Sequence, residues 1–113
     1  MAYPRRYAKG RQPTQGEMNK LERRYSEQLE AWRLTGEIQW WKYDAIKLRL
    51  ADKTFYTPDF LVMKADSTLE VHETKGHWED DARVKIKVAA EAYPLFRFVA
   101  IQLVKGEWVT EEF

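Results

Sequence analysis

The chain has 113 residues, 44% of them hydrophobic, and a formal net charge of +1, which suits one globular domain rather than a disordered segment. It contains no cysteine, which excludes disulfides and thiolate metal sites. No apolar run approaches the ~18 residues of a membrane span and the N-terminus lacks the apolar centre of a secretory signal, so we expect a cytoplasmic protein.

The N-terminal segment is basic, whereas the chain as a whole is nearly neutral. The first 16 residues contain no acid and four basic residues, which are Arg5, Arg6, Lys9 and Arg11. A basic arm ahead of the first ordered element is suited to contacts with phosphate groups. The alternative is a flexible end that only improves solubility. In either case we expect a flexible arm over 1–14 and a single domain over 15–113.

The first regular element is predicted to be a helix over about 15–35. Thr14 and Glu17 have the spacing of a capping box, in which a hydroxyl and a carboxylate each satisfy a free backbone N–H. Apolar residues then recur at helical spacing. They are Met18, Leu21, Tyr25, Leu29 and Trp32. Gly36 is suited to the left-handed position that ends a helix.

Three strands are predicted next. Residues 38–50 (IQWWKYDAIKLRL) are rich in β-branched and aromatic residues, and a turn over 51–53 leads to a second strand over 54–64. A polar turn over 65–67 precedes a third strand, 68–75, which Gly76 ends. In the first strand Trp40 and Trp41 are neighbours, so they face opposite ways and one of them is expected in the core.

The last third is predicted to contain a helix and two strands. Residues 78–94 begin with acids and continue with alanines, which favours a helix ended by Pro94 over a strand. The nearly continuous apolar run over 96–104 predicts a strand covered on both faces, and a short strand follows over 108–110. A strand, a helix and a strand in one sheet imply a right-handed parallel crossover. We therefore expect an α/β sandwich with a mixed sheet, in the order helix, three strands, helix, strand.

Two acids and a lysine occupy the second and third predicted strands. If the turn between these strands centres on Asp66, antiparallel pairing places Asp59 directly opposite Glu73, with Cβ atoms about 4.5–5.5 Å apart. Lys75 lies two residues after Glu73 and therefore projects from the same face. Two adjacent carboxylates repel each other unless a cation neutralises them. Such oxygen ligands suit Mg²⁺ or Mn²⁺, which activates water and neutralises charge on a phosphodiester. The alternative is an ordinary surface pair of Glu73 with Lys75.

The sequence Pro58-Asp59, followed by Glu73-Thr74-Lys75 at the end of the next strand, resembles the signature of the PD-(D/E)xK nuclease superfamily. The likeness covers about residues 17–104 and is nearest to small phage-encoded endonucleases described as Holliday junction resolvase-like. In those proteins an acid-bearing helix ends in a Gly-Glu-Ile-like stretch before the sheet, and here residues 34–38 are LTGEI. The resemblance implies a restriction-endonuclease-like sandwich.

The resemblance also implies a role for individual residues. Asp59, Glu73 and the backbone carbonyl of Thr74 would bind the metal, and Lys75 would act on the attacking water or the scissile phosphate. The further acid that relatives carry in the first helix corresponds to Glu22, for which a salt-bridged surface position is the alternative. The resemblance also places Lys85 and Lys87 of the second helix near DNA, for which a solvated helix face is the alternative. His77, just past the third strand, and Arg5 and Arg6 of the basic arm are further residues expected to contact DNA. His72 is expected to point away from Glu73.

The expected function is that of a magnesium-dependent (or manganese-dependent) endodeoxyribonuclease acting on DNA, with a role in recombination at branched DNA. A junction resolvase would act as a homodimer, because two symmetric cuts need two active sites. The chain has no helix-turn-helix or zinc-finger pattern, which favours recognition of DNA shape or recruitment by a protein partner. One alternative is nicking, end processing or degradation of DNA on the same fold. The other is a non-catalytic module that binds nucleic acid or protein.

Overall fold

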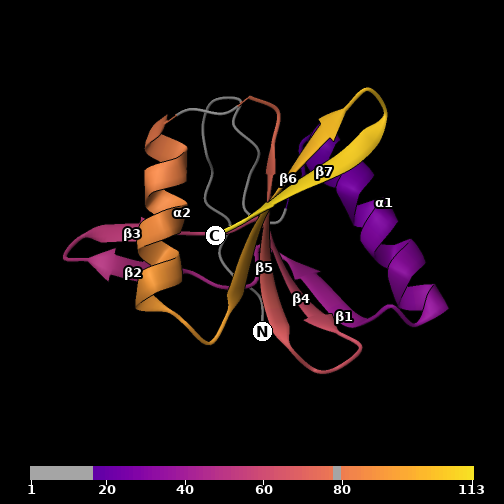
Figure 1. The fold of residues 1–113 in the computed structure, drawn as a ribbon, viewed down its shortest axis with the longest axis horizontal. Coiled ribbons are helices and arrows are strands. Elements are labelled where there is room, and N and C mark those ends of the chain that lie inside the picture. The colour runs from indigo at the N-terminus through magenta and orange to yellow at the C-terminus, as the bar shows by residue number, and fades with distance from the viewer. Residues whose placement is uncertain (1–16, 78–79) are drawn as a thin grey trace.

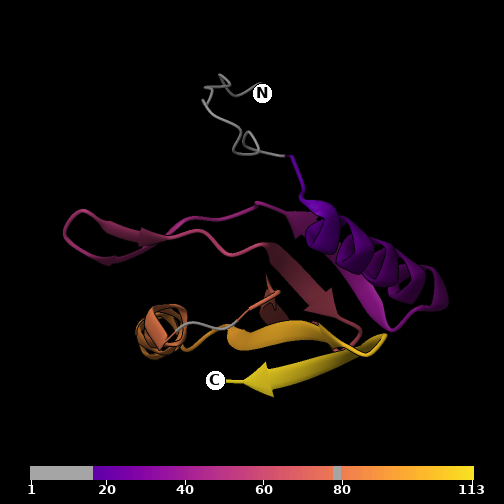
Figure 2. The ribbon, with the colours of Figure 1, turned by 90° about the horizontal axis from the view of Figure 1, so that it is seen from above.

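In the computed structural model, which describes residues 17–77 and 80–113, a mixed five-stranded sheet carries one helix on each face (Figures 1 and 2). The chain is thus of the α/β class, as expected. The elements are α1 (Lys20–Thr35), β1 (Ile38–Tyr43), β2 (Leu48–Ala51), β3 (Thr54–Tyr56), β4 (Phe60–Lys64), β5 (Leu69–Lys75), α2 (Asp80–Ala92), β6 (Arg97–Val104) and β7 (Glu107–Glu112). Within the described residues, no helix is long and apolar enough to cross a membrane.

The sheet combines an antiparallel meander with a parallel crossover. Its strand order is β1-β4-β5-β6-β7, and β4 is antiparallel to both β1 and β5. The chain then leaves β5 through α2 and returns as β6, which is parallel to β5. This confirms the predicted strand, helix and strand crossover. β7 completes the sheet by pairing antiparallel with β6.

The predicted order of strands is wrong in detail, because both of the first two predicted strands are divided. The run 38–50 breaks after β1, where Asp44 has a left-handed backbone with φ of 56°. The run 54–64 breaks between β3 and β4 at Pro58, which has no N–H to donate to a strand ladder. As a result β2 and β3 pair only with each other, and this hairpin is inserted between the sheet strands β1 and β4.

The first helix begins later than predicted. Residues 17–19 precede it, and Asn19 and Glu22 form a capping box at its start. The capping box predicted for Thr14 and Glu17 involves Thr14, which lies outside the described residues. The Glu22 backbone N–H donates to Asn19 Oδ1 over 2.8 Å, and the Asn19 N–H donates to Glu22 Oε1 over 2.9 Å. The predicted end is confirmed, since Gly36 has φ of 87° and donates its N–H to carbonyls of the last turn.

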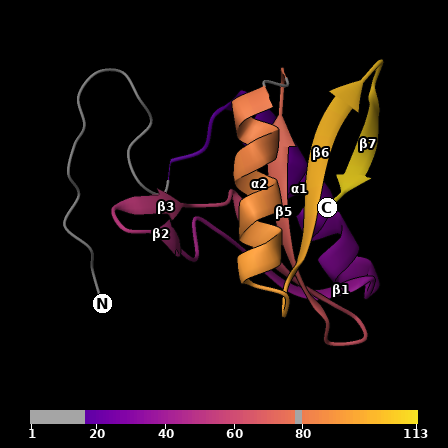
Figure 3. The same ribbon diagram turned by 60° about the vertical axis from the view of Figure 1, so that its left-hand side comes forward.

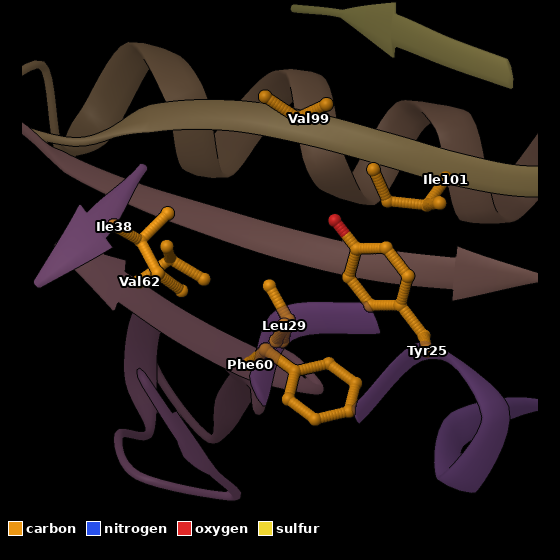
Figure 4. Close-up of a cluster of buried hydrophobic side chains, with 7 residues drawn as sticks. All are labelled: Tyr25, Leu29, Ile38, Phe60, Val62, Val99 and Ile101. Carbon is orange, nitrogen blue, oxygen red and sulfur yellow. The ribbon is translucent and has the colours of Figure 1, made fainter. Parts of the chain in front are cut away.

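The core on the α1 side of the sheet consists of residues contributed by α1 and by the strands β1, β4 and β6 (Figure 4). Its buried members are Tyr25, Leu29, Ile38, Phe60, Val62, Val99 and Ile101. The exposed fraction of Leu29 and Phe60 is 0%. Trp41 packs against this core while Trp40 remains 42% exposed, as expected for neighbours on a strand.

The core on the α2 side joins the second helix, the sheet and the hairpin. Ile86 and Ala89 of α2 are buried against Val71 of β5 and Phe98 of β6. Leu48 and Tyr56, the residues at the base of the β2–β3 hairpin, belong to the same cluster. α2 therefore fixes the base of the hairpin to the body of the protein.

Replacement of Leu29 with alanine should destabilise the protein by about 2–5 kcal/mol, because it leaves a cavity between α1 and the sheet. Urea unfolding would measure the change. Leu34→Ala is the matched control on the same helix, since Leu34 is 72% exposed, and its effect should stay within about 0.5 kcal/mol. Equal losses for the two variants would contradict the packing of α1 described above.

Candidate active site

The pairing of β4 with β5 has the register expected from the sequence. Phe60 lies opposite His72, and Leu61 lies opposite Val71. One step further along this register, Asp59, the residue before β4, meets Glu73. A hydrogen bond of 3.1 Å from the Asp59 backbone N–H to Glu73 Oε1 links the two residues directly.

The carboxylate of Asp59 is held by the residue that follows Glu73. Its Oδ2 atom accepts a hydrogen bond of 2.9 Å from the Thr74 backbone N–H and another of 2.8 Å from the Thr74 hydroxyl. Two donors on one residue fix both the position and the rotation of the carboxylate. Within the described residues, both of these hydrogen bonds reach Oδ2, and no donor reaches Oδ1 of Asp59.

The carboxylate of Glu73 is also oriented by two different groups. The Tyr56 hydroxyl donates to its Oε1 atom over 2.9 Å, alongside the Asp59 N–H. The Lys75 ammonium lies 3.3 Å from its Oε2 atom. The side chains of Lys75 and Glu73 are 21% and 13% exposed, respectively, so the pair is largely removed from water without being sealed off. The structure thus brings Asp59, Glu73, Thr74 and Lys75 together.

Burial and mutual repulsion make ionisation of this acid pair unfavourable. The pKa of Asp59 is raised to about 8, first by burial and then by the negative charges of Glu73 and Glu22, against the opposing hydrogen bonds from Thr74. Burial also raises the pKa of Glu73, although Lys75 and the hydroxyl of Tyr56 act in the opposite direction. A bound cation would remove the repulsion, since it favours the ionised form of both groups.

Glu22 is close enough to the pair for its charge to act on Asp59, and it is buried, with 9% of its surface exposed. The alternative of an exposed surface acid is therefore wrong. Its Oε1 atom accepts from the Asn19 backbone N–H and, over 2.9 Å, from the Tyr43 hydroxyl. Glu22 thus caps α1 and at the same time adds negative charge beside Asp59.

His72 lies on the opposite face of the sheet from Glu73, as expected from strand alternation. It is buried between the Tyr25 hydroxyl, 2.7 Å from Nδ1, and the Glu70 carboxylate, 2.8 Å from Nε2. These residues line a pocket of about 360 Å³ on the α1 side, together with Arg97. His72 is therefore part of a separate polar network and not a neighbour of the acid pair.

The residues expected near DNA are less tightly placed than the acids. Lys85 and Lys87 are exposed on α2, and His77 is exposed just after β5. Arg5 and Arg6 lie outside the described residues. None of the hydrogen bonds and ion pairs given above for the acid pair involves Lys85, Lys87 or His77.

Three polar groups at the site were missed by the sequence analysis. They are the hydroxyls of Tyr56, Thr74 and Tyr43, which donate to Glu73, Asp59 and Glu22, respectively. The signature motif contains Thr74, but only its backbone carbonyl was assigned a role. Strand alternation directs Tyr56 and Tyr43 to one face or the other, yet nothing in the sequence indicates which acid each hydroxyl reaches.

The donor set fits a small hard cation that keeps part of its water shell. Within 17–77 and 80–113, no group of three or more His, Cys, Asp or Glu side chains is placed to bind one ion. Asp59, just before β4, and Glu73 on the adjacent β5 nevertheless offer carboxylate oxygens. Mg²⁺ is commonly bound by one or two carboxylates plus waters and substrate phosphates. A two-carboxylate site of this kind is compatible with such an ion.

Comparison of the chain with protein-family models, with curated proteins and with solved structures finds no match in any of the three. A mixed sheet between two helices supports many unrelated activities. The side chains around Asp59 and Glu73 are therefore the features on which a functional proposal for this chain depends.

In the absence of metal, the Asp59→Asn variant should be more stable than the parent at pH 8, and this difference should be larger at pH 8 than at pH 4. Between the ordinary carboxyl pKa of 3.8 and the folded value of about 8, folded Asp59 keeps a proton that the unfolded chain has released, so stability of the parent falls as pH rises. Asparagine does not ionise and avoids this loss. We expect a gain of about 0.5–2 kcal/mol at pH 8, measured by urea unfolding in the presence of a chelator.

Asp66→Asn is the control for this prediction, because hydrogen bonds from Thr68 lower the pKa of Asp66. The folded parent therefore gains stability as pH rises through the range in which Asp66 titrates. The Asp66→Asn variant cannot ionise at this position, so it should not gain this stability. The two substitutions are therefore expected to change stability in opposite directions. A loss of stability in Asp59→Asn at pH 8 would contradict the apposition of the two acids.

Proposed function

We propose that this chain is a metal-dependent endodeoxyribonuclease with a site of the PD-(D/E)xK type, which uses Mg²⁺ or Mn²⁺ to hydrolyse DNA phosphodiester bonds. The observation that carries the proposal is the position of Asp59, the residue before β4, beside Glu73 of β5, with the Lys75 ammonium 3.3 Å from Glu73. Two acids and a lysine gathered at one partly exposed site suit metal-dependent hydrolysis of a phosphodiester. We find no contribution of this cluster to the stability of the fold. The proposal includes the restriction-endonuclease-like type of sandwich.

The residues around the acid pair would have different roles in catalysis. Asp59 and Glu73 would hold the cation with the backbone carbonyl of Thr74. When bound, such an ion supplies a water of lowered pKa and neutralises charge that develops on the phosphate. The Thr74 N–H and hydroxyl fix Asp59, and the Tyr56 hydroxyl fixes Glu73, so neither acid has to reorganise when substrate binds.

Lys75 would act on the substrate side of the site. Its ammonium, beside Glu73 Oε2, is placed to orient the attacking water or to donate to a nonbridging phosphate oxygen. Glu22 adds a third negative charge near Asp59 and would strengthen the attraction for a cation.

Cleavage of labelled DNA in the presence of Mg²⁺ tests this proposal. The substrates are a four-way junction, linear duplex, single strand and supercoiled plasmid, each incubated with the parent protein, with chelator and with Glu73→Ala. We expect cleavage of at least one substrate that is abolished by the chelator and by the substitution. Circular dichroism of Glu73→Ala would verify that the variant folds.

The outcomes separate the alternatives. Paired symmetric cuts near the branch point would identify a junction resolvase and, with it, a homodimer. Cutting of every DNA would identify a general nuclease whose target is chosen by a partner or by context. An absence of cleavage in Mg²⁺ and in Mn²⁺ by the folded parent, with DNA still bound, would overturn the nuclease proposal in favour of a binding module.

Tyr56→Phe should reduce the cleavage rate by about 10- to 100-fold, the usual effect of removing a hydrogen-bond partner of a metal ligand. Tyr56 is a positioning residue, so the variant should require more Mg²⁺ for half-maximal rate. Tyr25→Phe is the control, because the Tyr25 hydroxyl contacts His72 on the other face of the sheet. It should leave the Mg²⁺ dependence unchanged. Equal Mg²⁺ dependence of Tyr56→Phe and parent would contradict this role.

A further inference from the structure

The β2–β3 hairpin projects from the body of the protein beside the candidate site. It belongs to neither edge of the five-stranded sheet and forms a sheet of two strands on its own. Figures 2 and 3 show it extending away from both the main sheet and α1. An isolated two-stranded hairpin is only marginally stable, so its persistence here depends on how its base is attached.

The attachment is made by the inner face of the hairpin. Leu48 and Tyr56 pair with each other at its base and are both 6% exposed, packed in the α2-side core. At the end of α2, the Tyr93 hydroxyl donates to the Arg49 carbonyl over 2.8 Å and accepts from the Arg49 N–H over 3.2 Å. The hairpin is thus held in a defined orientation before any ligand binds.

The outer face of the hairpin carries an aromatic ring among cations. Arg49 pairs with Phe55, and both point away from the face that Leu48 and Tyr56 bury. Phe55 is 42% exposed, and the Lys47 Nζ atom lies 4.7 Å from the centre of its ring. Lys53 occupies the turn, so residues 47–56 contain three basic residues and one acid.

The one acid does not cancel this charge. Asp52 pairs with Arg49 over 3.4 Å, but the two side chains are 84% and 62% exposed, respectively. An ion pair so open to solvent is weak and is screened by salt. A phosphate group can therefore replace Asp52 as the partner of Arg49.

We propose that this outer face binds DNA that presents an unpaired base, which stacks on Phe55 while Lys47, Arg49 and Lys53 contact the adjoining phosphates. The inference rests on the proposed function, since it assigns to that site DNA with local single-stranded character, such as a fork or a branch. An exposed ring can stack on any base that is unstacked, whereas a closed duplex presents no base face to it. A single exposed ring is also too small an apolar area for a stable protein interface.

The position of the hairpin joins this surface to the acids. Tyr56 follows Phe55 in the chain, and its hydroxyl donates to Glu73. DNA bound on the outer face would therefore be anchored at the neighbour in the chain of Tyr56, the residue whose hydroxyl orients Glu73 from the opposite face of the hairpin. The outer face of the hairpin would select the form of DNA that reaches Asp59 and Glu73. It would not take part in the hydrolysis itself.

The first test measures binding by fluorescence anisotropy, using labelled forked DNA and closed duplex of the same sequence in the Asp59→Asn protein, in which cleavage is blocked. Phe55→Ala should weaken binding of the fork by about 5- to 150-fold, the worth of one stacked base, and leave the duplex within about twofold. Phe55→Trp keeps a ring and should retain the preference. Trp40→Ala is the matched control, because Trp40 is also 42% exposed but lies on β1.

The second test addresses the cations. Lys47→Ala/Arg49→Ala should reduce the slope of log affinity against log salt concentration by about one to two for both DNAs, because each lost phosphate contact lowers it by about 0.7–0.9. The control is Lys64→Ala/Arg97→Ala. These two cations lie at the ends of β4 and β6 that are remote from Asp59. An unchanged slope in the hairpin variant, or an equal change in the control, would overturn the proposal.

The results are distinguishable from failure of the nuclease proposal. If the parent cleaves DNA but folded Phe55→Ala binds fork and duplex as the parent does, the hairpin inference is overturned and the nuclease proposal stands. An equal loss for both DNAs would also overturn the inference. If the parent does not cleave but Phe55→Ala selectively loses the fork, the surface is supported without the chemistry.

Discussion

The feature on which the rest of the site depends is the register between β4 and β5. A shift of one residue would send Asp59 to the other face of the sheet and separate it from Glu73. The register is fixed by the apolar residues that follow, since Phe60 and Val62 are completely buried beneath α1 while Val71 is buried beneath α2. Hydrophobic burial on both faces thus determines the position of two acids that contribute nothing to that burial.

The acid pair opposes folding, and the surrounding donors limit its effect. Thr74 supplies two hydrogen bonds to Asp59, and Tyr56 and Lys75 engage the two oxygens of Glu73, yet burial still keeps the pKa of both acids above the ordinary range. Strain of this kind is typical of sites maintained for chemistry rather than for stability. The same donors that moderate the repulsion also hold each carboxylate in one orientation. A fixed orientation of the carboxylates is what the binding of a metal ion requires.

The inserted hairpin extends the reach of a small domain. The sheet and its two helices bury both faces of β5, so they leave little free surface beside the acids. The first predicted strand is interrupted at Asp44 and the second at Pro58, and the residues between these two positions form β2 and β3. Burial of Leu48 and Tyr56 against α2 stabilises the β2–β3 hairpin. Arg49 and Phe55, on the other face of the hairpin, are directed to solvent.

Periodicity, turn residues and strand alternation are local signals, and they were sufficient to predict four features of this protein. These features are the class of fold, the crossover from β5 through α2 to β6, the helix end at Gly36, and the register that brings Asp59 to Glu73. The sequence did not determine where α1 begins, since Thr14 with Glu17 and Asn19 with Glu22 have the same spacing, and nothing in that spacing shows that the helix starts at Lys20 behind Asn19. It also did not determine the division of the early strands or the partners of Tyr56 and Thr74. Those depend on contacts between residues far apart in the chain, which exist only after the sheet and α2 have assembled.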